Sequence, residues 1–359
     1  MADEISHSPL RCPDSEAAEP HAPAPEPVLS RRVFLQTVGA VVLAEAASHL
    51  LSAQAQGNPA ASLPVPARPA ANVDRASKAE TLVKTLYDSL TPRQREVVCL
   101  PWDHPRRQMV QANWAVIEPT LAEQFTPDQR EIVRGILRKL TTEAWYPKIL
   151  AQMQNDSGGL DTYHAAFFGD PDHGKFEWVL TGRHVTLRAD GHSDDNAAFG
   201  GPIFYGHAPQ FNETPTHPGN IYWFQAQQAN KVFGALDGKQ RAIALLDRAP
   251  NEDQIALQGA RGAFPGIPIG ALSRDQKELV QTVMRDLLAP YRPSDADDVL
   301  RDIHANGGLD DIHLAFYKQD DLGSDGVWDI WRLEGPALVW HFRGAPHVHT
   351  WVHVAKKAA

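Results

Sequence analysis

The sequence predicts an α+β fold that is internally duplicated, with each half made of helices followed by an antiparallel β meander. Predicted helices that begin at capping residues come first, and short β-branched and aromatic segments separated by turns follow them. Segregated helices and strands are typical of α+β rather than alternating α/β proteins. A long motif also occurs twice, at residues 158–168 and 307–317. Such self-similarity at a large offset indicates a duplication.

The repeated motif reads GGLDTYHAAFF in its first copy and GGLDDIHLAFY in its second copy. Two shorter segments upstream, 90–95 and 126–131, match 236–241 and 273–278 in the same order and at almost the same offset. The sequence therefore predicts a first half over residues 75–220 and a second half over 221–359, which together form one domain with pseudo-twofold symmetry.

Four predicted helices share one start signal, a Ser, Thr or Asp followed three residues later by Gln. The first side chain accepts a hydrogen bond from a backbone N–H, and the Gln side chain reaches back to the N–H of the capping residue. The four pairs are Thr91–Gln94, Thr126–Gln129, Asp237–Gln240 and Ser273–Gln276. These motifs predict helix starts rather than catalysis, and a further helix is expected over 222–236.

Short aromatic and β-branched runs predict the strands that close each half. They lie at 163–168, 176–180 and 183–188 in the first half, and at 312–318, 327–333, 337–343 and 347–354 in the second. Thr181-Gly182 is the expected hairpin turn. Residues 198–220 are expected to form a long irregular crossover, because they contain Gly200-Gly201-Pro202 near their start and several more prolines after it.

Residues 1–55 are predicted to be a disordered leader followed by a twin-arginine signal peptide. Arg31 and Arg32 precede Val-Phe-Leu and a mildly apolar run, and Ala53 and Ala55 form a small-x-small cleavage pattern. The apolar run falls short of the roughly 20 residues that a membrane span needs. The alternative is an amphipathic surface helix with a chance arginine pair. Residues 56–74 form a Pro/Ala-rich linker.

The export signal predicts a periplasmic or secreted bacterial protein that meets the twin-arginine translocase as its partner and has no stable membrane span once mature. With 34 Lys and Arg against 44 Asp and Glu, the chain has no basic stripe, which argues against nucleic acid as a partner. The two cysteines, Cys12 and Cys99, cannot build a disulfide framework or a four-cysteine zinc site.

The C-terminal strand carries the strongest chemical signal. Alternation places His347, His349, Trp351 and His353 on one face. Imidazoles at positions i and i+2 of a strand can hold one metal ion. Candidates for a further ligand are His184, His207, His217, His353 and Glu213. The ion would be a divalent transition metal, with zinc, copper and iron not distinguished. The alternative is a polar, solvent-facing side of the sheet.

Several segments, in their order, resemble the domain-of-unknown-function family 3500, whose members are often exported. They are 167–171 (FFGDP), 178–184 (WVLTGRH), 204–209 (FYGHAP) and 347–351 (HVHTW), and the resemblance covers roughly residues 75–355. The family pattern implies functional histidines at His184, His347 and His349. Arg183 stands where the family has a first hairpin histidine. The family name implies no activity.

The sequence therefore leads to two functional hypotheses and leaves open whether the protein is an enzyme. The first is a metal-dependent hydrolase in which His184, His347 and His349 meet in a cleft and His207 and His217 complete it. The second is a non-catalytic periplasmic binding or scaffold protein with a small-molecule or polymer ligand in an aromatic groove. Converging histidine nitrogens would favour the first, and splayed histidine side chains the second. A redox role lacks a haem or iron–sulfur signature.

Overall fold

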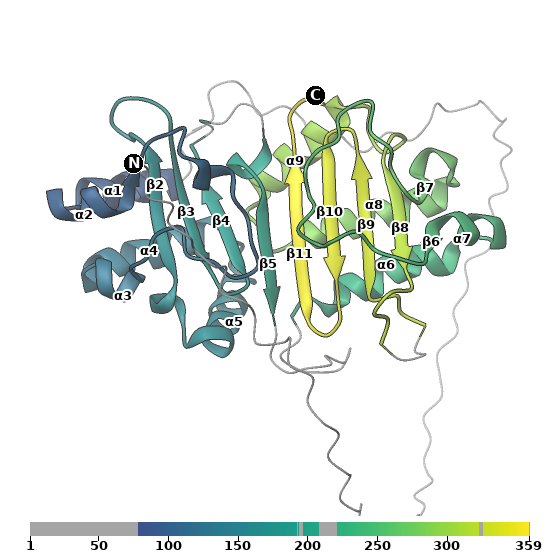
Figure 1. Ribbon diagram of the computed structural model, residues 1–359, viewed down its shortest axis with the longest axis horizontal. Helices are drawn as coiled ribbons and strands as arrows, with labels where there is room; N and C mark the ends of the chain where they lie inside the picture. Colours follow the sequence, from purple (N-terminus) through teal and green to yellow (C-terminus); the bar gives the residue numbers. More distant parts are fainter. Residues whose placement is uncertain (1–77, 192, 194–196, 208–220, 323–325, 359) are drawn as a thin grey trace, which may run out of the picture. The chain divides into compact units, whose positions relative to one another are not determined.

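The computed structural model describes residues 78–191, 193, 197–207, 221–322 and 326–358, and its central feature is one large sheet (Figure 1). The predicted signal peptide with Arg31, Arg32, Ala53 and Ala55, and the linker, lie outside these residues. No helix in the described part of the chain is long and apolar enough to cross a bilayer.

The first half of the chain places five helices before or between its strands. The helices are α1 (Lys78–Asp88), α2 (Pro92–Val98), α3 (Leu121–Gln124), α4 (Pro127–Leu140) and α5 (Tyr146–Ser157). The strands are β1 (Cys99–Leu100), β2 (His164–Gly169), β3 (Phe176–Gly182), β4 (Val185–Ala189) and β5 (Ile203–His207). Helices therefore dominate the early part and strands the late part, as the α+β prediction requires.

The second half follows a closely similar order. Its helices are α6 (Trp223–Ala235), α7 (Gly238–Ala244), α8 (Arg274–Leu288) and α9 (Pro293–Ala305). Its strands are β6 (Leu245–Leu246), β7 (Ile267–Pro268), β8 (His313–Tyr317), β9 (Ile330–Gly335), β10 (Leu338–Arg343) and β11 (Val348–Val354). The mixed helices and mostly antiparallel strands confirm the α+β class.

Within the described residues the strands form a single 11-stranded sheet. Its order is β1-β2-β3-β4-β5-β11-β10-β9-β8-β6, and β7 pairs with β8. Only the short β1 and β6 run parallel to their neighbours, β2 and β8. The two halves meet where β5 pairs antiparallel with β11, so that Gly206 lies opposite His349 (Figure 1).

The predicted capping boxes are confirmed at the starts of α2, α4, α7 and α8. In each, the Ser, Thr or Asp side chain accepts the backbone N–H of the Gln, and the Gln side chain accepts the N–H of the capping residue. Pro92 and Pro127 occupy the first helical position, where the missing N–H has no intrahelical partner to lose. Local sequence thus fixes where these helices begin.

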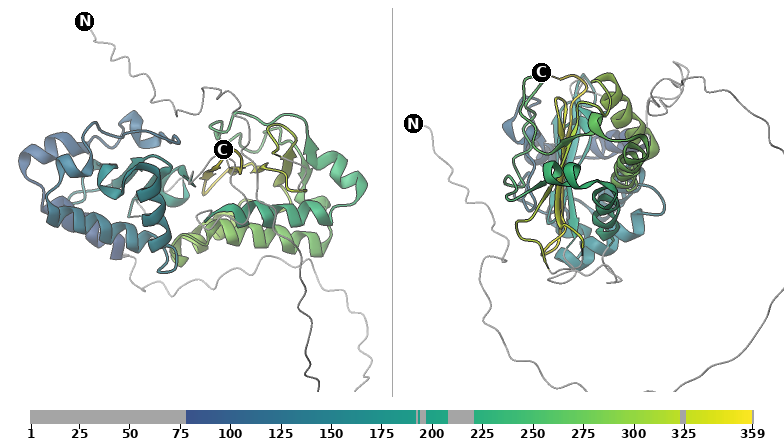
Figure 2. Two further views of the ribbon diagram at one scale, coloured as in Figure 1. Left: turned by 90° about the horizontal axis from the view of Figure 1, so that it is seen from below. Right: turned by 90° about the vertical axis from the view of Figure 1, so that its right-hand side faces the viewer.

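Both faces of the sheet are covered. Helices lie along one face (Figure 2). Loop residues cover the other, where Trp114 donates to the Thr186 hydroxyl at 2.9 Å and Ile255 packs with Trp351. All residues of β4 and β5 are buried as a result. A strand buried on both sides offers a site shielded from water.

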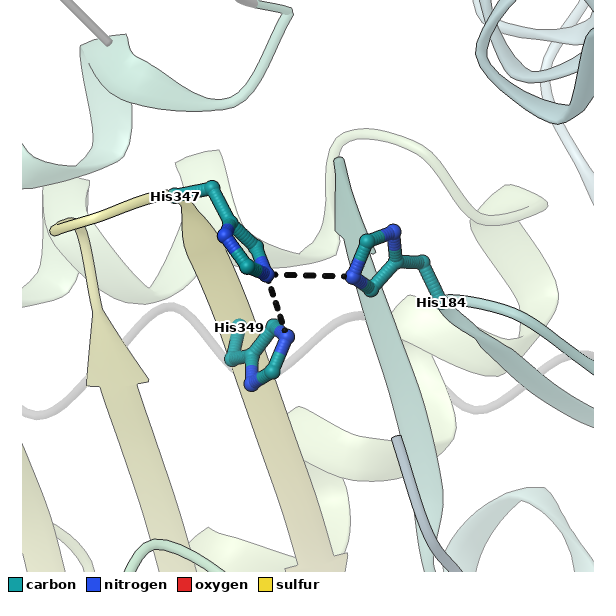
Figure 3. Close-up of side chains that lie close together, drawn as sticks. All are labelled: His184, His347 and His349. Carbon is teal, nitrogen blue, oxygen red and sulfur yellow. Dashed lines mark hydrogen bonds between the residues drawn. The ribbon is translucent and has the colours of Figure 1, made fainter. Parts of the chain in front are cut away.

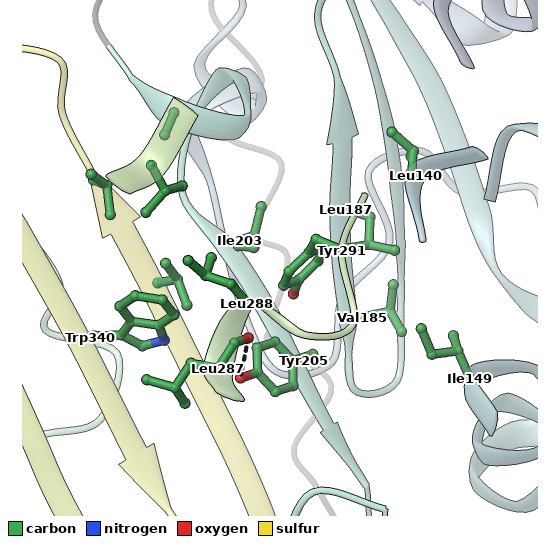
Figure 4. Packing of buried hydrophobic residues seen from close by; sticks show 14 of the residues in the cluster. Leu140, Ile149, Val185, Leu187, Ile203, Tyr205, Leu287, Leu288, Tyr291 and Trp340 are labelled. Atoms are coloured by element: carbon green, nitrogen blue, oxygen red, sulfur yellow. Dashed lines mark hydrogen bonds between the residues drawn. The ribbon is translucent and has the colours of Figure 1, made fainter. Parts of the chain in front are cut away.

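The hydrophobic core continues across the junction of the two halves (Figure 4). Leu287 and Leu288 of α8 pack beside Tyr205 of β5, and the Tyr205 hydroxyl donates to the Leu287 carbonyl at 3.4 Å. Trp340 of β10 belongs to the same cluster. Because α8 of the second half packs on a strand of the first, the junction is held by core packing as well as by the β5–β11 ladder.

The structure corrects two details of the predicted strands. Residues 203–207 form β5, so the prediction of an irregular crossover is wrong for that part; 208–220 lie outside the described residues. The turn between β3 and β4 is Arg183-His184 rather than Thr181-Gly182. The strand continues through Thr181 and Gly182 because Thr181 pairs with His164 of β2 and Thr186 of β4, and Gly182 pairs with Val185.

Candidate metal site

Three imidazoles from distant parts of the chain converge beside the β5–β11 junction (Figure 3). His184 comes from the β3–β4 turn, His347 immediately precedes β11, and His349 lies in β11. The Nε2 atom of His347 is 3.3 Å from Nε2 of His184 and 2.9 Å from Nε2 of His349. All three nitrogens therefore point to one small volume, and the three side chains together could hold a metal ion.

The backbone around the cluster is built to bring His184 inward. His184 has a φ of 59°, in the left-handed region that residues other than glycine rarely adopt. Its N–H donates to the Ala112 carbonyl at 2.8 Å, and its own carbonyl accepts the N–H of Gly206 at 3.1 Å. Backbone strain of this kind is retained mostly where function requires it.

Gly206 makes room for two of the rings. A Cβ atom at this position would lie 3.3 Å from Cδ2 of both His184 and His349 and 2.4 Å from the Val348 carbonyl oxygen. The last distance is shorter than real Cβ contacts allow. The absence of a side chain at Gly206 is therefore what lets the two imidazoles pack against strand β5.

Two carboxylates orient the outer nitrogens of the cluster. Nδ1 of His184 lies 2.6 Å from Oδ2 of Asp156, near the end of α5, and Nδ1 of His349 lies 3.0 Å from Oε1 of Glu252. A carboxylate accepts a hydrogen bond, so each Nδ1 carries the proton and each Nε2 keeps its lone pair. Carboxylate–histidine pairs of this kind set the tautomer of metal-binding histidines.

Burial keeps His347 and His349 neutral. Burial, followed by the charges of neighbouring His349 and Arg343, lowers the pKa of His347 to about 2. Burial and Arg343 also hold the pKa of His349 well below its ordinary value. Burial raises the pKa of Asp156. Its hydrogen bond with His184 and the charge of that ring lower the pKa by more, so the net change is a decrease. Neutral imidazoles beside ionised carboxylates are the forms that bind a metal.

The spacing of the nitrogens fits a transition metal. Two nitrogens at about 2.0–2.1 Å from a tetrahedral ion lie roughly 3.3 Å apart. The measured separations of 3.3 and 2.9 Å are close to this value. Arg343 Nη2 lies 3.4 Å from Nε2 of His347, and because a guanidinium can only donate, that Nε2 also carries a lone pair. Three such nitrogens form a donor set that a transition metal takes, and the residues present fit a bound divalent ion.

The other candidates from the sequence lie outside this group. His353, on the same strand, uses Nδ1 to donate to the Ile255 carbonyl at 3.0 Å. His207 is buried at the end of β5, and its nitrogens do not join the three that converge. His217 and Glu213 lie outside the described residues. The solvent-facing alternative is wrong, because His347 and His349 are only 1% and 3% exposed.

A second group with metal-ligating side chains lies on an exposed turn, at Asp170, Asp172 and His173. Local bonds account for it. The Asp172 N–H donates to Oδ1 of Asp170 at 2.8 Å, His173 Nδ1 bonds Oδ2 of Asp170 at 2.9 Å, and Lys84 pairs with Asp172 at 2.6 Å. These contacts are those of a solvated turn.

The sequence did not predict three residues around the cluster: Asp156, Glu252 and Arg343. Asp156 lies two residues before the repeated Gly-Gly motif, but nothing local indicates that it meets a residue 28 positions further on. Glu252 is 97 positions from its partner His349. Arg343 could have been found from the register, because it pairs with His349 across β10 and β11 and so shares its face.

An open cleft of about 760 Å³ lies on the same face of the sheet as the histidine cluster. Asp253, Gln254 and Ile255, which follow Glu252 directly, line it. Its floor includes Arg332 and Glu334, which are each 4% exposed and approach to 3.7 Å. The loop that orients His349 thus also forms a wall of the cleft.

The fold and the site define a class of α+β protein in which one large sheet, covered on both faces, carries a buried three-histidine cluster with carboxylate partners. The chain belongs to the family described as protein of unknown function (DUF3500), whose model matches residues 72–356. This confirms the resemblance found in the sequence. No curated protein and no solved structure matches the chain.

Proposed function

We propose that this protein binds one divalent transition metal ion through His184, His347 and His349 and acts as a metal-dependent hydrolase after export. One observation carries the proposal: three Nε2 atoms converge, and the Nδ1 atoms of two of the rings are held by the carboxylates of Asp156 and Glu252. Two such carboxylate pairs on one cluster favour a metal site over a structural histidine contact.

A three-histidine set leaves a coordination position open, so a bound ion would supply Lewis-acid activation of water or a carbonyl group. The chain itself does the positioning. Asp156 and Glu252 fix the ring orientations, and burial shields the three imidazoles from bulk water. The cleft on the same face of the sheet, lined by Arg332, Glu334 and the residues that follow Glu252, offers space for the body of a substrate.

Metal analysis of the purified full-length protein tests the site. After growth with zinc, copper and iron supplied, we expect about one equivalent of a single transition metal per chain. The double variant His347→Ala/His349→Ala should lose it. The matched control is His353→Gln, which removes an imidazole from the same strand face and should retain the metal. Equal metal content in the wild type and the double variant would overturn the proposal.

A ligand-binding protein without catalysis is the second candidate, and the open cleft favours it. One measurement distinguishes the hydrolase from the ligand-binding protein. Metal-loaded protein should hydrolyse at least one ester, amide or phosphoester in a substrate panel, and His184→Asn should abolish this turnover. A ligand that binds in the cleft without turnover, with the same affinity in His184→Asn, would instead support the binding role.

We also propose that the protein is exported by the twin-arginine route, since Arg31, Arg32, Ala53 and Ala55 stand in the order that such a signal needs. Periplasmic fractions of the producing cell should then contain a chain that begins near residue 56. Arg31→Lys combined with Arg32→Lys should leave a precursor in the cytoplasm. A wild-type chain found unprocessed in the cytoplasm would contradict export.

A gene duplication is the third part of the proposal. The strand order supports duplication. Counted inward from one edge the sheet runs β1, β2, β3, β4, β5, and counted inward from the other edge it runs β6, β8, β9, β10, β11. The Gln side chains of the capping boxes also bond in matching pairs, Gln94 to Gln129 at 2.7 Å and Gln276 to Gln240 at 2.8 Å. Family members should carry the Gly-Gly-Leu-Asp motif in both halves, and its restriction to one half would count against duplication.

A further inference from the structure

We propose that the open coordination position of the three-histidine site takes an oxyanion, specifically a carboxylate, and that the guanidinium of Arg343 receives it. This inference rests on the proposed metal site and deepens it by naming the chemical class of the group that binds there. It is carried by the position of Arg343, by the charge around the site and by the exposure of the side chains beside it.

Arg343 points at the nitrogens that would hold the ion. Its Nη2 lies 3.4 Å from Nε2 of His347. On its other side, Nε lies 3.4 Å from Oε2 of Glu252 and Nη1 lies 3.5 Å from Oε1 of the same carboxylate. Glu252 therefore anchors the guanidinium, while one edge of the fork remains directed at the metal position. A cation and a guanidinium this close repel each other unless an anion lies between them.

The charges around the cluster leave an excess of positive charge. The three imidazoles are neutral ligands, and the nearby carboxylates are those of Asp156 and Glu252. Against these two negative charges stand a divalent ion, Arg343 and Arg183. Both arginines lie beside the cluster: Arg343 Nη2 is 3.4 Å from Nε2 of His347, and Arg183 directly precedes His184 in the β3–β4 turn. A neutral fourth ligand would leave this excess in a buried place, whereas an anion reduces it.

Arg183 has spare capacity for the same anion. It precedes His184 in the β3–β4 turn, and its Nε is buried with no hydrogen-bond partner among the described residues. A buried donor without a partner is costly, so such groups usually await a ligand or water. Arg183 occupies the position at which the family resemblance implies a histidine. In this chain the hairpin therefore supplies the positive charge of Arg183 at the position where the family pattern has a histidine that could bind a metal.

The charged side chains beside the cluster are more exposed than the imidazoles. The side chains of Arg343 and Glu252 are 20% and 28% exposed, whereas His184, His347 and His349 are 0%, 1% and 3% exposed. An incoming molecule on this side meets the guanidinium before it meets the imidazoles. Glu252 leaves Nη2 of Arg343 free to donate to one oxygen of a carboxylate, while the other oxygen would take the open coordination position. The two oxygens of a carboxylate thus match the two positive groups of the site.

The test uses the full-length protein loaded with Co(II), or with Cu(II) if copper is the metal retained, and follows the visible absorption of the ion. Titration with acetate should shift the metal bands with a saturating curve. Acetamide, which has nearly the same shape and no charge, should leave them unchanged at the same concentrations. A titration with phosphate is the third arm of the test. Phosphate that binds as tightly as acetate would show a general oxyanion site and overturn the preference for a carboxylate, whereas weaker binding of phosphate would support it.

Arg343→Gln should weaken acetate binding about tenfold or more, since it removes a charged donor. Arg274→Gln is the matched control, because that side chain is 75% exposed on α8, and it should bind acetate like the wild type. Failure of the protein to bind either metal would overturn the proposed function itself. Metal binding with identical spectra in acetate and acetamide would overturn this inference alone. That comparison needs only the wild type, so it decides the question even if the Arg343 variant does not fold.

Discussion

The Oδ2 atom of Asp156 lies 2.6 Å from Nδ1 of His184, and neither side chain has any exposed surface. Glu252 holds His349 in a similar way at 3.0 Å, but its side chain is 28% exposed. One carboxylate comes from a helix of the first half and the other from a loop of the second. Each half thus orients a histidine from its own half, and the two meet at the β5–β11 junction.

Asp156→Asn should weaken metal binding by about 10–100-fold, the usual cost of losing a carboxylate behind a histidine ligand. Glu252→Gln should cost less, because water can replace a partly exposed carboxylate. Chelator competition on both variants measures the two affinities. The control is Asp161→Asn, which changes a carboxylate that pairs with Arg130 and Arg134 away from the cluster. Affinities equal to that of the wild type in both site variants would show that these carboxylates do not orient the ligands.

Gly206→Ala should abolish metal binding, because the new methyl group must displace the Val348 carbonyl or the rings of His184 and His349. The matched control is Gly234→Ala in α6, where a Cβ atom meets nothing within 4 Å. That change should leave metal content intact and raise helix stability by about 0.5–1 kcal/mol. Metal content and thermal unfolding of both variants give the answer. A Gly206→Ala protein that binds metal normally would mean that the junction is more adaptable than its contacts indicate.

Local signals predicted much of the fold. The capping boxes mark the starts of α2, α4, α7 and α8, and strict alternation placed His347 and His349 on one face of the last strand. Strand β5 could not be predicted, because five residues between Gly200-Gly201-Pro202 and a proline-rich stretch carry a weak signal. Its pairing with β4 and β11 fixes it as a strand.

The outer partners of the site depend on tertiary structure in the same way. His184 is a candidate ligand both from its place in the predicted hairpin and from the family resemblance, but its partner Asp156 belongs to a helix with no distinguishing motif. Glu252 lies in a loop whose path over the sheet is set by packing of Ile255 against Trp351. Such contacts between residues far apart in sequence have no local pattern, so sequence reasoning found the inner ligands and missed the side chains that orient them.

His341 should make the metal-free protein lose stability in acid. Burial, and then the charge of Arg332, lower its pKa from 6.5 to about 3. Between these values the unfolded chain binds a proton that the folded chain does not, so the free energy of unfolding falls as pH decreases below 6.5. The slope is about 1.4 kcal/mol per pH unit for one such group. His341→Gln should reduce the slope between pH 6 and pH 4.5 by this amount, as measured by urea unfolding, and leave it unchanged above pH 7. An unaltered slope in acid would mean that His341 titrates normally in the folded protein.

Arg188 is expected to stabilise the first half through a buried network. It pairs with Glu177, whose other oxygen accepts Arg107 Nη1 at 3.0 Å, and it donates to the carbonyls of Pro202 and Met109 at 2.7 and 2.6 Å. Arg188→Met leaves Glu177 buried with one cation fewer, which should cost about 3–5 kcal/mol in urea unfolding.

The double variant Arg188→Met/Glu177→Leu separates the cost of an unpaired charge from the cost of lost packing. Replacing both members of a buried ion pair with apolar side chains removes the uncompensated charge, so the double variant should regain part of the stability lost in Arg188→Met. The Pro202 and Met109 carbonyls lose their donor in both proteins, which limits the recovery. As a control, Arg138→Ala breaks an exposed pair with Glu143 and should leave the unfolding midpoint unchanged, because water screens that pair. A double variant less stable than Arg188→Met would show that Glu177 is stabilised by Arg107 alone and that Arg188 acts mainly through the backbone carbonyls of Pro202, Met109 and Arg107.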